Sequence, residues 1–169
     1  MHVSRHIAHL SPRGDDDWSY DLPKDALLPL RGILSTELMH APDMRDKFDQ
    51  RCLLVVKNGN ASGPTVGRAT GAHSIVREYT ASGEHHTSME WAILSLDSTA
   101  DVFSKPGDSG AIIADIRGRI GGLLTGGAGA GNYKDPEPDV TYATPFWWLL
   151  GRMQANGFPN VNLDVSEFL

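Results

Sequence analysis

Short apolar stretches separated by turn residues fill the middle of this chain, from residue 52 to residue 145. Residues 53–56 are apolar and are followed by Lys57 and an Asn-Gly pair, and further strand-like segments follow at residues 65–70, 74–79 and 87–96. Stretches of this length, rich in β-branched residues and bounded by turn signals, are typical of antiparallel strands. We count about six strands up to residue 145, and short strands at such spacing predict one small antiparallel β-barrel, an all-β fold.

The first part of the chain lacks this pattern. Residues 1–24 are polar and of mixed charge, which indicates a disordered arm. Farther along, Ser35 or Thr36 could cap a short helix, and residues 43–49 could be helical as well. We therefore predict an irregular, partly helical N-terminal arm or linker over residues 1–49, the barrel with a closing helix over residues 50–155, and a tail over residues 156–169.

The bulk properties exclude several classes of function. A length of 169 residues suggests one domain, and a net charge of −6 without a Lys/Arg cluster argues against a nucleic-acid partner. No apolar stretch reaches the roughly 18 residues that span a membrane, so no membrane partner is expected. The single cysteine, Cys52, excludes an internal disulfide. Since no signal peptide is visible either, an intracellular location is favoured.

One pentapeptide carries the strongest chemical signal. Residues 106–110 read Pro-Gly-Asp-Ser-Gly, a sequence suited to a tight turn that exposes the Ser109 hydroxyl. Nucleophilic serines need such a turn, together with two backbone N–H groups directed at the developing oxyanion. The motif is not the G-x-S-x-G elbow of α/β-hydrolases, because Ala111 holds the final glycine position. The glycines of residues 126–131 match no phosphate-binding loop, so no cofactor is expected.

The residues around and after Ser109 resemble chymotrypsin-like (trypsin-like) serine proteases, and they are similar to trypsin-like proteins of fungi. An apolar stretch at residues 111–116, a turn at 117–119 and a returning strand at 120–127 form the hairpin that the resemblance implies after the nucleophile. A strand at 140–145 and a helix from 146 to 153 would close the domain. The resemblance covers residues 50–155 and implies the C-terminal barrel half of such a protease.

The resemblance also assigns roles to single residues. Ser109 would be the nucleophile, the N–H groups of Gly107 and Ser109 would form the oxyanion hole, and Asp108 would support the turn by pairing with a buried amine. Phe103 would lie at the base of an apolar, shallow specificity pocket that disfavours Arg and Lys; the alternative is that Phe103 is a core residue. The remaining substrate-binding positions would be Thr125, Gly126 and Gly127, which pair with the substrate backbone, and Val140 and Tyr142 on the far wall.

A base for Ser109 is not evident. In the family a His and an Asp come from a first barrel, and we find no such barrel before Ser109. His73, His85 and His86 are expected at the surface. Glu90 is expected on the outer face of a strand. No metal site is expected, because the N-terminal histidines have one-face helical spacing but no Cys or Glu completes a ligand set; they are His2, His6 and His9.

The sequence therefore predicts a serine endopeptidase-like domain that is inactive alone, with a peptide or protein as substrate. The alternative is a catalytically silent, protease-like module that binds a peptide or a protein. An apolar helix containing Trp147 and Trp148 cannot bury both rings on one face, so one should be exposed. We expect the chain to dock onto a separate first barrel or onto a second copy of itself.

Overall fold

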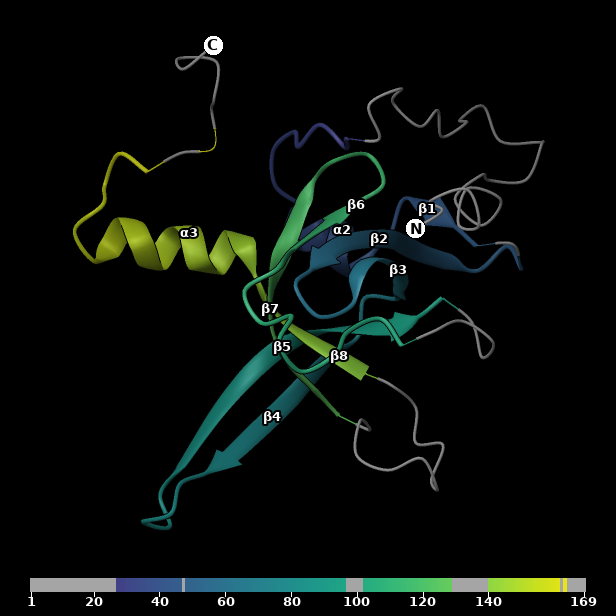
Figure 1. Ribbon diagram of the computed structural model, residues 1–169. Coiled ribbons are helices and arrows are strands. Elements are labelled where there is room, and N and C mark those ends of the chain that lie inside the picture. Colours follow the sequence, from purple (N-terminus) through teal and green to yellow (C-terminus); the bar gives the residue numbers. More distant parts are fainter. Residues whose placement is uncertain (1–26, 47, 97–101, 129–139, 162, 164–169) are drawn as a thin grey trace, which may run out of the picture.

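The computed structural model describes residues 27–46, 48–96, 102–128, 140–161 and 163. Within these ranges eight strands belong to one antiparallel sheet, and a ten-residue helix follows the last strand (Figure 1). The elements are α2 (Thr36–His40), β1 (Met44–Arg45), β2 (Arg51–Gly59), β3 (Gly63–Ala69), β4 (His73–Tyr79), β5 (His85–Ser95), β6 (Ile112–Asp115), β7 (Ile120–Ala128), β8 (Val140–Pro145) and α3 (Phe146–Ala155).

Six of the strands close into a ring. Neighbours in the ring follow the order β2, β3, β5, β8, β7 and β6, and β6 pairs with β2 to complete it. The predicted mainly-β, antiparallel architecture is thus confirmed, as are the hairpin after Ser109, the strand at 140–145 and the helix that follows it. The strand predicted at 74–79 is present as β4, but it lies outside the ring because it pairs only with β5.

Alternate residues of the ring strands fill one hydrophobic core. Leu53 and Val55 of β2, Trp91 and Ile93 of β5, and Ile113 of β6 have no exposed surface. The two-residue periodicity of a strand turns these side chains toward the same side of the sheet. The core therefore lies inside the closed ring, and the connections between strands are left to carry the candidate site.

The segment before β2 packs against the ring. Leu34, Met39 and Met44 belong to the same core cluster, although the sequence placed them in an arm that ends at residue 49. The predicted helix cap is confirmed, because the Ser35 hydroxyl accepts a hydrogen bond from the Leu38 N–H at the start of α2. The helical prediction for residues 43–49 is wrong. Met44 and Arg45 pair with β2, and the Asp46 carboxylate accepts hydrogen bonds from two N–H groups of the following turn.

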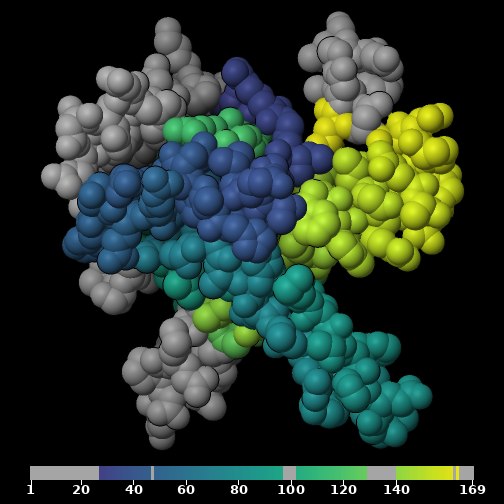
Figure 2. Space-filling model, turned by 180° about the vertical axis from the view of Figure 1, so that it is seen from behind, coloured from purple at the N-terminus to yellow at the C-terminus, as the bar shows by residue number. Residues whose placement is uncertain are grey.

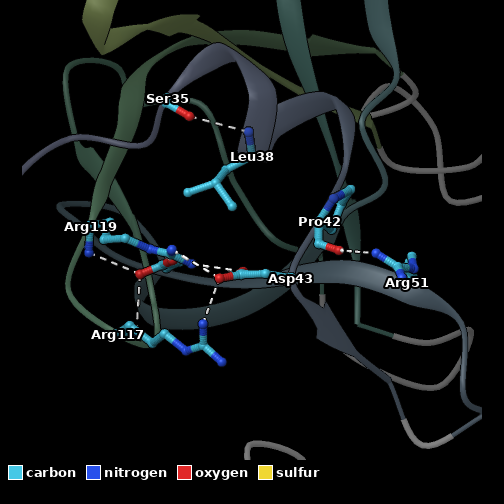
Figure 3. Close-up of polar contacts among 8 residues, drawn as sticks. Ser35, Leu38, Pro42, Asp43, Arg51, Arg117 and Arg119 are labelled. Carbon is cyan, nitrogen blue, oxygen red and sulfur yellow. Dashed lines mark hydrogen bonds and ion pairs between the residues drawn. The ribbon is translucent and has the colours of Figure 1, made fainter.

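Polar contacts fix this segment to the β6–β7 hairpin. The Asp43 carboxylate contacts Arg117 at 2.6 Å and Arg119 at 2.9 Å, as Figure 3 shows. Arg119 also contacts the buried Asp115 at 2.6 Å. A parallel bridge between Ile33 and Ile120 adds backbone hydrogen bonds to the same junction. Residues 27–46 are therefore joined to the ring by charge pairs, backbone pairing and core contacts.

Two elements project from the body. The outer half of the β4–β5 hairpin extends away from the ring, and α3 projects from another side (Figures 1 and 2). Ile75, Tyr79 and Met89 on the hairpin are largely exposed. Both tryptophans of α3 are exposed, Trp147 by 40% and Trp148 by 47%, whereas the sequence predicted exposure of one. No helix among the described residues has the length and apolar character needed to cross a membrane.

Candidate functional site

Ser109 lies on an exposed tight turn that precedes β6. Gly107 and Gly110 have φ angles of 102° and 83°, which are accessible to glycine and strained for other residues. The turn is held by backbone hydrogen bonds from Asp108 N–H to the Lys105 carbonyl and from Ala111 N–H to the Asp108 carbonyl, each 3.0 Å long. The two glycines therefore allow a bend that leaves the side chain of Ser109 in solvent while its neighbour Asp108 is buried.

Two backbone donors of this turn have no acceptor. Among the described residues, no group accepts a hydrogen bond from the N–H of Gly107 or of Ser109. The N–H groups of Asp108 and Gly110, which flank them, are both used, by the carbonyls of Lys105 and Leu124. The turn thus presents alternate amides to a ligand, and these are the two donors that the sequence assigned to an oxyanion hole.

Hydrogen bonds to the buried Asp108 carboxylate hold the turn in place. Asp108 is buried, and its carboxylate accepts hydrogen bonds from the N–H groups of Ala61 and Ser62 at 2.8 and 3.0 Å. The Lys105 N–H donates a further bond of 2.9 Å, and the Ser62 hydroxyl donates one of 2.6 Å. The β2–β3 turn and the Ser109 turn therefore share one carboxylate, although they are far apart along the chain.

The counter-charge of Asp108 comes from inside the ring. The Lys57 ammonium lies 3.1 Å from the Asp108 carboxylate, and neither side chain has exposed surface. The ammonium also donates a hydrogen bond of 2.6 Å to the Ser62 hydroxyl, and it lies 5.4 Å from the centre of the Phe103 ring. A cation at this distance over an aromatic face is attracted by the ring. The buried amine that the resemblance implied for Asp108 is thus the side chain of Lys57.

These contacts shift the pKa of Asp108. Burial on its own raises the pKa of the Asp108 carboxyl, because the charged form loses hydration. The hydrogen bonds from the Ser62 hydroxyl and from the N–H groups of Lys105, Ser62 and Ala61 outweigh burial and lower the pKa below its ordinary value. Asp108 is therefore ionised throughout the neutral range, and the turn is held by a charged group.

An open strand edge begins beside the turn. Gly110 N–H donates to the Leu124 carbonyl at 2.8 Å, and Leu124 N–H donates to the Ala111 carbonyl at 3.0 Å. The β6–β7 ladder ends at this point, so in the described chain residues 126–128 pair on one side only, with β8, and Thr125 lies at a register shift between Leu124 and Gly126. Unpaired strand edges offer backbone donors and acceptors to an extended peptide. Three residues of this edge were predicted to bind substrate: Thr125, Gly126 and Gly127.

The other predicted substrate-binding residues fall in different environments. Phe103 has no exposed surface and belongs to the core cluster, which is the alternative that the sequence left open. Val140 and Tyr142 are half-buried on β8, opposite Ala128 and Gly126 of β7. The Ser104 hydroxyl lies 2.6 Å from that of Thr141, which ties the chain before the Ser109 turn to β8. The structure thus brings β7, β8 and the turn together, while the Phe103 ring packs beneath Lys57.

The described histidines do not contact Ser109. His85 and His86 are exposed on the β4–β5 hairpin, as predicted. His73 is half-buried, and its ring stacks on that of His40 with the centroids 4.9 Å apart, which corrects the surface prediction. Within the described ranges no imidazole makes a hydrogen bond to the Ser109 hydroxyl. The proposed N-terminal histidine face lies outside these ranges: His2, His6 and His9.

Glu90 differs from its predicted placement in one respect. Its strand position is on the side opposite the core residue Trp91, but the carboxylate is buried, and the Thr144 hydroxyl donates a 3.0 Å hydrogen bond to it. The described residues hold no group of three or more His, Cys, Asp or Glu that would suit a metal ion. Neither Glu90 nor another carboxylate orients an imidazole near Ser109 in the part of the chain that the structure describes.

Sequence reasoning missed three residues of this site. Lys57 lies in an apolar strand, Ser62 in the following turn, and Gly59 between them. A Cβ atom at Gly59 would collide with the Asp108 carboxylate, so only glycine leaves room for it. The one available signal was a lysine at the end of a buried strand, since a lysine is rarely buried unless it is paired.

We found no protein-family model that matches this chain and no significant match among curated proteins.

Proposed function

We propose that this chain is a serine endopeptidase-like domain in which Ser109 is the nucleophile, and that the six-strand ring is a β-barrel of the trypsin-like type. The observation that carries the proposal is the Ser109 turn itself. The exposed Ser109 hydroxyl lies between Gly107 and Gly110, and the N–H groups of Gly107 and Ser109 have no acceptor in the described chain. The Asp108 carboxylate, directly before Ser109, pairs with the buried Lys57 ammonium. A turn with no chemical role does not require this combination.

The proposed chemistry is acyl transfer. The Ser109 oxygen would attack the carbonyl carbon of a peptide bond while a base removes the hydroxyl proton. The N–H groups of Gly107 and Ser109 would donate to the resulting oxyanion, and the amine would leave with a proton from the base. Water would then hydrolyse the acyl-enzyme. Because no described imidazole reaches Ser109, the base must come from outside the described residues, and the chain alone should react slowly.

The open edge of β7 supports a peptide as substrate. An extended peptide added to residues 125–127 would run beside the Ser109 turn, because Leu124 is hydrogen-bonded to Gly110. The residues of this edge and the facing Val140 and Tyr142 are uncharged, and the Glu90 carboxylate, which accepts a hydrogen bond from the Thr125 hydroxyl, is buried. We therefore expect small or apolar residues to be preferred over Arg and Lys next to the cleaved bond.

An external base tests this function directly. Hydrolysis of p-nitrophenyl acetate is measured with and without millimolar imidazole, for the wild-type chain and for Ser109→Ala. We expect imidazole to increase a Ser109-dependent rate, and an acetyl group to be found on Ser109 by peptide mapping. Removal of one oxyanion donor costs on the order of 10²–10³ in rate, so even a partial site should exceed the background of Ser109→Ala. Equal rates for both proteins with imidazole present would contradict the proposal.

A second candidate function is a catalytically silent module that binds a peptide. The open β7 edge together with the lack of a described base favours it, because strand addition needs no nucleophile. Binding of an extended apolar peptide that is equal in wild type and Ser109→Ala, combined with no acetylation of Ser109, would support this alternative.

A further inference from the structure

A chain of buried polar contacts connects the interior of the ring with the Ser109 turn. It begins at Lys57 near the end of β2, passes through the Ser62 hydroxyl, and ends at the Asp108 carboxylate. The two charged side chains have no exposed surface, so water does not compete for their hydrogen bonds. A buried charge that loses its partner is strongly unfavourable, and each of these groups therefore depends on the other.

The groups around the Lys57 ammonium fix its position next to Asp108. Its ammonium has Asp108 at 3.1 Å, the Ser62 hydroxyl at 2.6 Å and the Phe103 ring at 5.4 Å. Gly59 lies so close to Asp108 that a methyl group at residue 59 would displace the Asp108 carboxylate. The position of Asp108 is thus determined from β2 and from the β2–β3 turn.

We propose that Lys57 is a positioning residue for the Ser109 nucleophile, acting through Asp108. Its ammonium draws the Asp108 carboxylate into the ring, which turns the amides of Gly107 and Ser109 outward on either side of it. This inference rests on the proposed function, because a positioning role has meaning only if Ser109 reacts.

A simple structural role predicts something different. If the Lys57–Asp108 pair only stabilised the ring, breaking it would weaken all elements together, as breaking any buried pair would. The chain offers a matched control in Arg119, which pairs with the buried Asp115 on the other end of β6. Arg119 is not in contact with the Ser109 turn in any described interaction.

The experiment compares Lys57→Met with Arg119→Met by hydrogen exchange of single amides. We expect Lys57→Met to reduce the protection of the Lys105, Asp108 and Ala111 amides at least tenfold relative to the β7–β8 ladder. We expect Arg119→Met to leave that ratio unchanged and to act on the Arg117 and Arg119 amides, which donate to Asp115. The same relative change in both variants, or no change in Lys57→Met, would overturn the proposal.

A double variant keeps the test decisive if Lys57→Met does not fold. Lys57→Met combined with Asp108→Asn removes both charges and leaves no buried ion unpaired. We expect this protein to fold and to show the same loss of protection at Lys105 and Ala111. A double variant whose turn amides are as protected as in the wild type would contradict the role of the pair.

Labelling of Ser109 by a fluorophosphonate separates this inference from the proposed function. We expect the rate of labelling to fall at least tenfold in Lys57→Met and to be retained in Arg119→Met. Equal labelling in the wild type and Lys57→Met would overturn the positioning role and leave the nucleophile intact. No labelling of the wild type with imidazole present as the base, together with the expected loss of amide protection in Lys57→Met, would reject the proposed function and leave Lys57 as a group that only orders the turn.

Discussion

The two ends of β6 each carry a buried aspartate, and they are held in different ways. Asp115, at the end of the strand, accepts hydrogen bonds from the N–H groups of Arg117 and Arg119 in the adjoining turn and from the Arg119 side chain, which is 19% exposed. Asp108, before the strand, is held mainly by Lys57, Ala61 and Ser62, which are distant in sequence, and the Lys57 side chain has no exposed surface. One carboxylate closes a local hairpin turn, whereas the other joins two separate turns and leaves Ser109 exposed between unused amides.

The two clusters differ in which hydrogen-bonding groups around the buried carboxylate remain without a partner. The Asp115 cluster joins residues 27–46 to the ring through Asp43, whose carboxylate, like that of Asp115, is bound by arginine side chains (Figure 3). The Asp108 cluster satisfies the carboxylate completely but leaves the N–H groups of Gly107 and Ser109 free in the described chain. The two clusters therefore differ in what remains unpaired around a fully paired carboxylate.

The largest expected effect is the difference in the free energy of unfolding between Lys57→Met and Arg119→Met. Lys57→Met leaves Asp108 buried without its partner, and we expect the free energy of unfolding to fall by about 3–5 kcal/mol. Arg119→Met leaves Asp115 with two N–H bonds, and we expect a loss of about 1–3 kcal/mol. Urea unfolding of the two variants measures the difference. A loss for Arg119→Met that equals or exceeds that for Lys57→Met would break the comparison.

The pH dependence of stability gives the next effect. Because the pKa of Asp108 is lowered in the folded chain, the unfolded state binds more protons as the pH falls through the ordinary carboxyl range. The stability from Asp108 is thus fully present above about pH 5 and declines below about pH 4, by up to about 1.4 kcal/mol per pH unit. Urea unfolding of the wild type and Asp108→Asn from pH 7 to pH 3 tests this. A difference between them that does not shrink with acid would contradict the assignment.

Removal of the Ser62 hydroxyl sharpens the comparison at the Asp108 end. Ser62→Ala takes one hydrogen bond from the Asp108 carboxylate and one acceptor from the Lys57 ammonium. Hydrogen bonds to charged groups contribute about 1.5–3 kcal/mol each, so we expect a loss of about 2 kcal/mol in thermal or urea unfolding. Ser35→Ala, at the cap of the short α2, serves as the control, with an expected loss of about 1 kcal/mol. A smaller loss in Ser62→Ala than in the control would contradict the role given to Ser62.

The smallest effect belongs to the exposed part of the Asp115 cluster. Asp43→Ala removes the contacts with Arg117 and Arg119, whose side chains are 33% and 19% exposed. Pairs in contact with solvent contribute about 1 kcal/mol or less, and salt screens them. We therefore expect a small loss that disappears in 1 M sodium chloride. A loss that persists at high salt would mean that Asp43 belongs to the buried cluster and not to its exposed edge.

The sequence predicted the parts of this molecule that depend on neighbouring residues. Strand–turn alternation was sufficient for the β6–β7 hairpin and for β8 with α3, and the Pro-Gly-Asp-Ser-Gly pentapeptide was sufficient to select the Ser109 turn. The helix predicted over residues 43–49 failed, because pairing of Met44 with Cys52 of β2 outweighed local helix signals. Propensity is a weak guide where a tertiary partner is available.

Long-range contacts explain what the sequence did not show. Nothing local identifies Lys57 as the partner of Asp108, since the two meet only when β6 closes the ring on β2. The assignment of Phe103 to a pocket or to the core likewise depends on that closure, which places the ring beneath the Lys57 ammonium. The resemblance implied that an amine would be present, and the fold was needed to name it.

The central claim is that the Ser109 turn stabilises the oxyanion that forms when its hydroxyl reacts, and selective phosphonylation with imidazole as the external base tests it most directly. A fluorophosphonate is incubated with the chain, and the modified serines are located and timed by peptide mass spectrometry, with Ser82 in the β4–β5 turn as an exposed internal reference. We expect Ser109 to react at least about tenfold faster than Ser82, because the proposed oxyanion donors adjoin Ser109. Equal rates at the two serines, or an adduct on Ser82 alone, would contradict it.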